Sequence, residues 1–321
     1  MIQKLARSSW LRVLLTAAIL GYLATELDMR AALRALLAVN PVHLLIVAVL
    51  VACDRAVMIW RWVLLLRSSG SPITTGDAAR IFLVSSFVGS FLPAGVGGDA
   101  ARAYALMRHT ARGGEAVASV AIDRYLGVVA LMLLGAAGAL SSTGLVSEGQ
   151  RVWLACAAVL LTIGSLSLFW LDKVVDVLMP ASWRGANIGR RLRSAAAGMG
   201  HYRGHPGTLL RVLMLSFTVQ LLRISQAYFL GLGLGIAVPF GYYLAFMPIG
   251  LLLLLLPVSI SGFGLPQTAI VWMLRPMNVP EPLSFALSTL IVLSGLAGNL
   301  PGAWLYLRGR HPEPPPRQGV V

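Results

Sequence analysis

The stretch IFLVSSFVGSFLPAGVGGDAARAYALMR, residues 81–108, decides the fold. Its first apolar segment ends at Pro93, a glycine-rich break follows, and a second segment begins at Asp99. At about 1.5 Å of rise per residue, neither segment covers the roughly 30 Å hydrocarbon core of a bilayer. Irregular backbone at that depth is tolerated only where protein or a water-filled cavity covers it. We therefore predict a re-entrant hairpin that enters the membrane and turns back, and we place the working site at its break.

The composition around this stretch is that of a membrane protein. The chain has 321 residues, of which 57% are hydrophobic and 12% charged, whereas soluble domains carry about 25% charged residues. Long apolar runs rather than alternating ten-residue strands favour an all-α polytopic membrane protein over a β-barrel. The net charge of +14 comes from basic residues beside the expected spans. This placement favours attraction to anionic lipid and excludes nucleic acid as the partner.

The apolar runs predict six full spans, at residues 10–25, 41–66, 116–140, 152–171, 208–234 and 283–307. A second broken hairpin is predicted at 242–274, interrupted at 257–264. Each half, 1–141 and 142–307, then has two spans, a hairpin and one span. An odd number of crossings inverts the second half, which gives the inverted repeats common in secondary transporters. The Pro-rich tail, 308–321, is expected to be disordered and cytoplasmic.

The distribution of basic residues predicts the orientation. Most of them fall in segments that share one side if the N-terminus is inside, including the long loop at 172–206. Cytoplasmic loops of membrane proteins carry such an excess of Lys and Arg. We therefore expect both termini to be cytoplasmic, with the first hairpin entering from the cytoplasm and the second from the other side.

Charged residues inside spans are costly, at about 2.5–3.5 kcal/mol each on insertion scales, so each needs a partner or a function. The first half carries such charges as Asp54-Arg55, Asp99 with Arg102, and Asp123-Arg124. Adjacent helical residues do not face each other, so partners are expected on other elements. An ion-pair cluster around the hairpin is one reading of these residues.

Arg223 is the charged residue that stands out in the second half. It lies near the middle of the span at 208–234, between Gln220 and Gln226 on one helical face. Two alternatives remain open. Arg223 borrows a carboxylate from the first half, or it faces an aqueous cavity and receives an anionic ligand.

The glycines before Asp99 have two readings as well. Backbone amides of residues 96–98 at a helix start form a natural anion site. Alternatively, Asp99 caps its own helix and pairs with Arg102. The chain offers no convincing metal set, because His201 and His205 lack Cys or acidic companions.

These motifs resemble the transmembrane, flippase-like family of lysylphosphatidylglycerol synthases. The resemblance covers nearly the whole chain and is carried by LPAGVGGD at 92–99, Arg102, Ser119, 123–124, Gly127, and PVSISGFG at 257–264. It implies a multi-span module that moves a lipid between leaflets. The synthase domain of the full-length relatives is not seen, so aminoacyl transfer is not expected. This chain has Pro266-Gln267 where the family often has Arg-Glu, so a charged contact there does not carry over.

From the residues and the resemblance together we expect a lipid flippase of a bacterial inner membrane that is not an enzyme and uses no cofactor or metal. Its partners would be membrane lipids with an anionic or otherwise polar headgroup, and either a second copy of the chain or a lipid-biosynthesis protein. The alternatives are an integral-membrane lipid-modifying enzyme, with Asp123 or Asp99 as base, and an accessory subunit of a lipid or glycolipid biosynthetic complex. The candidate substrate-binding residues are Arg223, Arg124, Arg102, Gly97, Gly98, Asp99, Asp123, Gln220, Gln226, Ser259, Gly262 and Gln267, with Asp54 and Arg55 as supporting ion pairs.

Overall fold

The described part of the chain is helical and contains no strand. The computed structural model describes residues 34, 36–91, 97–109, 113–141, 198–253 and 265–308. Helices long and apolar enough to cross a membrane are α4 (Pro41–Ser68), α7 (Gly113–Ser141), α12 (Pro206–Gly233), and the pair α15 (Glu281–Ala297) and α16 (Leu300–Leu307), which together cover Glu281–Leu307. They coincide with four of the six predicted spans, so the chain is a multi-pass membrane protein. The spans predicted at 10–25 and 152–171, and tail residues 309–321, lie outside the described residues.

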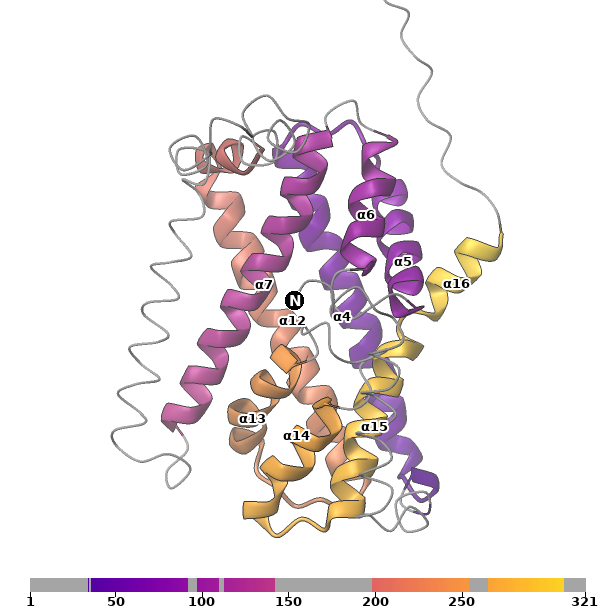
Figure 1. Ribbon diagram of the computed structural model, residues 1–321, viewed down its shortest axis with the longest axis vertical. Coiled ribbons are helices and arrows are strands. Elements are labelled where there is room, and N and C mark those ends of the chain that lie inside the picture. The colour runs from indigo at the N-terminus through magenta and orange to yellow at the C-terminus, as the bar shows by residue number, and fades with distance from the viewer. Residues whose placement is uncertain are drawn as a thin grey trace, which may run out of the picture.

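Two pairs of shorter helices occupy opposite ends of the molecule (Figure 1). The first pair is α5 (Thr75–Phe91) with α6 (Gly97–Met107), and the second is α13 (Phe240–Leu253) with α14 (Leu265–Leu274). Their 17, 11, 14 and 10 residues correspond to lengths of about 15–26 Å, shorter than a bilayer core. The second predicted break, at 257–264, lies outside the described residues, and so do residues 94–96 of the first break, whereas Gly97 and Gly98 already belong to α6. Short 3₁₀ turns, η2 (Tyr202–Gly204) and η3 (Arg275–Met277), precede α12 and follow α14.

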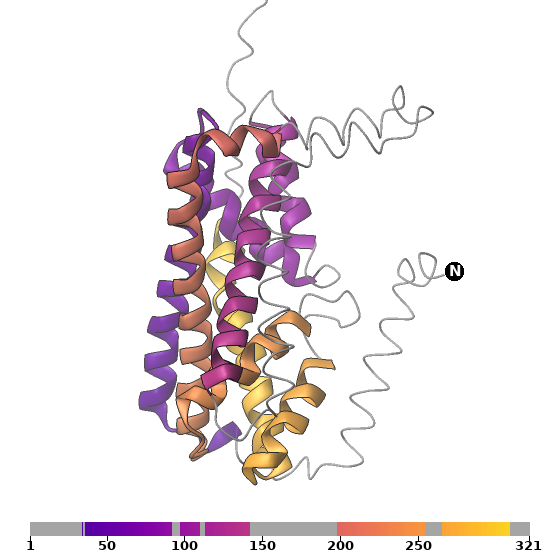
Figure 2. The same ribbon diagram turned by 90° about the vertical axis from the view of Figure 1, so that its left-hand side faces the viewer.

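Helices α4 and α12 pack against each other along much of their length, at the left side of the molecule in Figure 2. The start of α4 is encoded locally. Asn40 accepts a hydrogen bond from the Val42 amide at 2.9 Å, and Pro41 occupies the first helical position, where its missing N–H costs nothing. Helix α12 likewise begins at a proline, Pro206.

Each short-helix pair also packs against the last long helix of the other half of the chain. Helix α5 lies against α16, and α13 lies against α7. Glycines permit both contacts. A Cβ built on Gly138 would lie 2.5 Å from the carbonyl carbon of Leu244, and one built on Gly302 would overlap the backbone carbonyl of Leu83. In each contact, the backbone of a short helix from one half therefore lies directly against the backbone of a helix from the other half.

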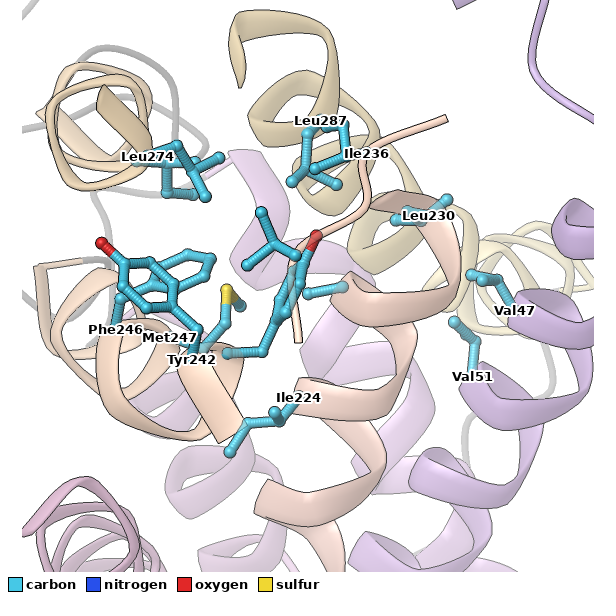
Figure 3. Close-up of a cluster of buried hydrophobic side chains, with 14 residues drawn as sticks. Val47, Val51, Ile224, Leu230, Ile236, Tyr242, Phe246, Met247, Leu274 and Leu287 are labelled. Atoms are coloured by element: carbon cyan, nitrogen blue, oxygen red, sulfur yellow. The ribbon is translucent and has the colours of Figure 1, made fainter. Parts of the chain in front are cut away.

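Two hydrophobic clusters fix the short helices to α4, and the larger one includes α12 as well. Figure 3 shows the larger cluster, in which Phe246 and Met247 of α13 and Leu274 of α14 gather with Ile224 of α12 and Leu287 of α15. The smaller cluster joins α4, α5, α6 and α7. Its buried members are Trp62, Val63, Leu66, Ala78, Ile81, Phe82, Ala103, Leu106, Ala116 and Val120. Both pairs of short helices are thereby packed against the long helices.

Candidate functional site: an arginine-rich central cavity

A cavity of about 350 Å³ lies between the helices, at the low end of the range of roughly 300–1,000 Å³ typical of small-molecule sites. Its walls come from α4, α5, α6 and α7 of the first half and from α12, α13 and α15 of the second. The charged residues among its lining are Arg55, Arg61, Asp99, Arg102, Asp123, Arg124 and Arg223. The cavity thus brings together charges from positions far apart in the sequence.

Asp123 is the centre of the most buried charge cluster. It is 1% exposed, and its two oxygens contact Arg61 Nε at 2.7 Å and Arg102 Nη1 at 3.3 Å. Arg61 also donates to Ser216 Oγ at 2.9 Å, which links α4 to both α7 and α12. Because both carboxylate oxygens are engaged by guanidinium groups, this cluster serves to join helices.

Arg102 is 4% exposed and contacts two carboxylates and two aromatic rings. It donates to Asp99 Oδ1 at 2.8 Å in addition to its contact with Asp123. Its guanidinium lies 5.2 Å from the ring centroid of Trp62 and 5.0 Å from that of Phe82, within the range of cation–π attraction. This arginine is therefore held as part of the protein interior, and α6 is anchored to α4, α5 and α7 through it.

Asp99 connects this buried cluster to the cavity. Its second oxygen contacts Arg124 Nε at 3.3 Å, and the Arg124 side chain is 41% exposed. Asp99 thus pairs with Arg102, as the second reading predicts, and it also lines the cavity. The anion site of the first reading includes residue 96, which lies outside the described residues. Gly98 lines the cavity too, and its backbone packs against Gly89 of α5, where a Cβ on Gly89 would lie 2.5 Å from Gly98 Cα. Gly97 begins α6 beside them.

Arg223 combines the two alternatives left open by the sequence. It contacts Asp54 Oδ1 at 3.2 Å through Nε and Met58 Sδ at 3.0 Å through Nη2, so it does borrow a first-half carboxylate. Its side chain nevertheless remains 30% exposed and lines the cavity. Arg223 is therefore paired with Asp54 and still partly exposed in the cavity.

Arg55 is partly satisfied by its described partners, Met58, Gly295 and Asp54. It donates to the Gly295 carbonyl at 3.1 Å, but its contact with Asp54 is long, at 3.9 Å. Its Nε has no hydrogen-bond partner among the described residues. Arg55 and Arg124 each lie close enough to Arg223 for their charges to repel. Arg55, Arg124 and Arg223 therefore bring three positive charges close together around the cavity.

The described charges around the cavity do not balance. Five arginines, 55, 61, 102, 124 and 223, face three aspartates, 54, 99 and 123. An excess of buried positive charge is expensive in a low-dielectric environment unless an anion or water compensates it. The cavity is therefore suited to an anionic group.

The remaining predicted site residues fall in different places. Gln220 lines the cavity, whereas Gln226 and Gln267 are buried away from its lining. Ser259 and Gly262 lie outside the described residues. Asp54 and Arg55 do act as ion-pairing residues.

Arg61 and Asn299 are among the polar cavity residues that reasoning from sequence does not single out. Arg61 follows Asp54 by seven positions, about two helical turns, so the same face of the predicted span already carried a second charge. Asn299 lies between α15 and α16, inside what reads as a continuous apolar run, and no sequence signal places it against Ser90 of α5.

Comparison with known proteins gives one family. The family model described as lysylphosphatidylglycerol synthase TM region matches residues 9–301. A search of curated proteins found no significant match. Within the described residues, no group of three or more His, Cys, Asp or Glu side chains could hold a metal ion.

Proposed function

The chain belongs to the family of lysylphosphatidylglycerol synthase TM regions, and from this premise we propose that it moves a lipid with an anionic or otherwise polar headgroup between the two leaflets of a membrane. Family membership associates the chain with membrane-lipid chemistry. The observation that carries the finer proposal is the charged cavity, which is walled by helices of both halves and contains more arginine than aspartate.

The proposed architecture is a pair of inverted repeats in six full spans. The short pairs α5–α6 and α13–α14 would be re-entrant hairpins that enter from opposite faces of the membrane. Their lengths and their positions at opposite ends of the molecule support this (Figure 1). So does the pattern of contacts, in which α5 packs on α16 as α13 packs on α7. Exchanging the halves maps each of these contacts onto the other, as a two-fold repeat requires.

The headgroup would occupy the cavity while the acyl chains remain in lipid. Arg223, Arg124 and Arg55 would attract the anion, because all three line the cavity and the side chains of Arg223 and Arg124 are 30% and 41% exposed. The anion would compete with Asp54 for Arg223, so binding would loosen a contact between α4 and α12. A ligand can shift a conformational equilibrium only through such a difference in contacts between states.

We place the protein in the inner membrane of a bacterium with both termini in the cytoplasm. The excess of basic residues on one side of the predicted topology supports this orientation. In that orientation the first hairpin enters from the cytoplasm.

The test is Arg223→Gln in proteoliposomes, with movement of a labelled anionic lipid measured by leaflet exposure. Loss of one charge-assisted contact should slow transport roughly 10–100-fold. Arg67→Gln is the matched control, because Arg67 lies in the last turn of α4 and outside the cavity lining, and its described contacts are a hydrogen bond to Thr75 and a cation–π contact with Trp60. Normal transport by Arg223→Gln would remove Arg223 from the proposed site.

A second variant separates transport from stability. Arg223→Gln alone leaves Asp54 buried with only the long contact to Arg55. Asp54→Asn combined with Arg223→Gln removes that uncompensated charge, so the double variant should regain stability without regaining transport. If the double variant recovered both stability and transport, the Asp54–Arg223 pair would have a structural role only.

The enzyme alternative has less support from the described residues. Its proposed bases, Asp99 and Asp123, both have their carboxylates engaged by arginines. It would be favoured if purified protein changed the mass of a bound lipid. The accessory-subunit alternative predicts normal folding and no transport by the isolated protein.

A further inference from the structure

The span that ends the second half is broken, whereas its counterpart in the first half is continuous. Helix α15 ends at Ala297 and α16 begins at Leu300, and Figure 1 shows α16 leaning away from the line of α15. Helix α7 runs from Gly113 to Ser141 without interruption. The two are counterparts because α16 packs against α5 as α7 packs against α13.

The break follows from the backbone hydrogen bonds at the joint. The Asn299 amide donates to the Leu296 carbonyl at 2.9 Å, three residues back, so it does not serve the Gly295 carbonyl as a helix would require. Pro301 has no N–H and cannot donate to the Ala297 carbonyl. Two successive helical bonds are therefore missing between α15 and α16.

Arg55 of α4 binds the carbonyl that this break releases. Its Nη2 donates to the Gly295 carbonyl at 3.1 Å. Gly298 leaves the space for the guanidinium, since a Cβ built there would lie 2.9 Å from Arg55 Nε. A buried carbonyl needs a donor, so the side chain replaces the backbone bond that the joint lacks. The angle at the joint is thereby tied to α4.

The same contact occurs in the other half, without a break beside it. Gln220 of α12 donates to the Gly127 carbonyl of α7 at 2.9 Å. Arg55 and Gln220 each lie fourteen positions after the first residue of their helix, and so do Gly127 and Gly295. Because α7 continues past Gly127, the Gln220 contact joins two unbroken helices. The Arg55 contact instead lies beside a joint.

The joint separates two packed units that face each other across the cavity. Beyond it, α16 is held on α5 by the close approach of Gly302 to Leu83 and by a hydrogen bond from Asn299 Nδ2 to Ser90 Oγ at 2.8 Å. Before it, α15 packs against α14 and α12. Both α5 and α15 contribute to the cavity lining. A change of angle at the joint would therefore change the separation of α5 and α15.

We propose that the joint between α15 and α16 is the hinge at which the cavity changes width, and that Arg55 is the positioning residue that holds it at the observed angle. Proline and glycine breaks are where helices bend, and a few such residues are enough for a hinge. Turning the eight residues of α16 by about 20° would move their far end by about 4 Å. In a step that rests on the proposed function, an anion in the cavity competes with Gly295 for Arg55 and so releases the hinge.

The test measures distances between spin labels by double electron–electron resonance. It uses the full-length protein in phosphatidylcholine nanodiscs, with both native cysteines replaced by alanine. Trp272→Cys in α14 and Leu307→Cys in α16 carry the labels across the joint. Tyr104→Cys in α6 and Leu140→Cys in α7 form the matched control pair beside the unbroken helix, and all four native side chains are exposed. Adding phosphatidylglycerol should shift the first distance by about 4 Å and leave the second unchanged.

Three variants separate the hinge from its ligand. Arg55→Ala should broaden the first distance without phosphatidylglycerol, because the Gly295 carbonyl loses its donor. Arg55→Gln, which gives α4 the amide of its counterpart in α12, should restore the narrow distribution. Pro301→Ala returns an N–H to the Ala297 carbonyl, so it should fix the first distance and slow lipid movement at least tenfold without lowering stability. A merely structural joint would leave lipid movement unchanged.

An identical first distance in the wild type, Arg55→Ala and Pro301→Ala would overturn the hinge, and so would normal lipid movement by Pro301→Ala. Normal movement by that variant would leave the proposed function standing. If Arg55→Ala does not fold, the wild type and Pro301→Ala decide the matter through their response to phosphatidylglycerol. If the wild type moves no lipid, the proposed function is rejected, and the distances in Arg55→Ala and Arg55→Gln still decide the hinge.

Discussion

Replacing Asp123 with asparagine should destabilise the protein strongly. The substitution keeps the shape of the side chain but removes the charge that holds Arg61 and Arg102, both of which are 4% exposed. Removing one partner of a buried ion pair typically costs about 3–5 kcal/mol, because the other charge is left uncompensated. Arg102 keeps Asp99, so the loss falls mainly on Arg61, and we expect about 3–4 kcal/mol.

Two other substitutions calibrate this magnitude. Gln220→Leu removes a neutral interhelical hydrogen bond to Gly127, and such bonds in membrane proteins average about 0.6 kcal/mol with a maximum near 1.7. Asp99→Asn should cost about 1 kcal/mol, because Asp99 is 23% exposed and its loss leaves Asp123 on Arg102. The expected order of destabilisation is therefore Asp123→Asn, then Asp99→Asn and Gln220→Leu together.

The assay is unfolding in mixed micelles with increasing SDS, followed by far-UV circular dichroism, alongside lipid movement in proteoliposomes. A destabilisation of Asp123→Asn below about 1 kcal/mol with complete loss of transport would refute the reasoning. Asp123 would then act on the substrate rather than on the helices.

Two further perturbations test the packing and one buried phenol. Gly138→Ala should lower stability, because its Cβ would meet the Leu244 backbone, whereas Gly241→Ala, which meets nothing within 4 Å, should be neutral or slightly stabilising in the same unfolding assay. Burial raises the pKa of Tyr202, just before α12, to about 12. Between pH 10 and 12 the unfolded chain then loses a proton that the folded chain keeps, so stability should fall with rising pH by about 2–3 kcal/mol. Tyr202→Phe should remove that part of the pH dependence, and an unchanged slope would contradict this assignment.

The long and the short helices could be predicted from the sequence, because apolar length and proline or glycine breaks are local properties. The expected ranges 41–66 and 116–140 agree with α4 and α7 to within a few residues. The stretch 81–108 predicts the first hairpin, and α5 begins earlier, at Thr75, where Thr74 Oγ1 accepts a hydrogen bond from the Asp77 amide at 3.1 Å.

The charge partners could not be predicted, because they depend on how distant helices meet. Asp54 and Arg223 are 169 positions apart, and Arg61 and Asp123 are 62 apart. Composition indicates that such charges need partners, but only the packing of α4 against α12 and α7 decides which arginine reaches which aspartate. The same dependence on packing explains why Asn299 could not be assigned to the cavity.

The contact between α5 and α16 has a consequence for biosynthesis. Gly302 follows Leu83 by 219 positions, so the face of α5 that α16 covers is synthesised long before α16 itself. At roughly 5–20 residues per second, that delay is on the order of 10–40 s. During that interval, lipid or an insertion factor has to cover this face of α5. Packing of α5 is completed only when α16 has been synthesised.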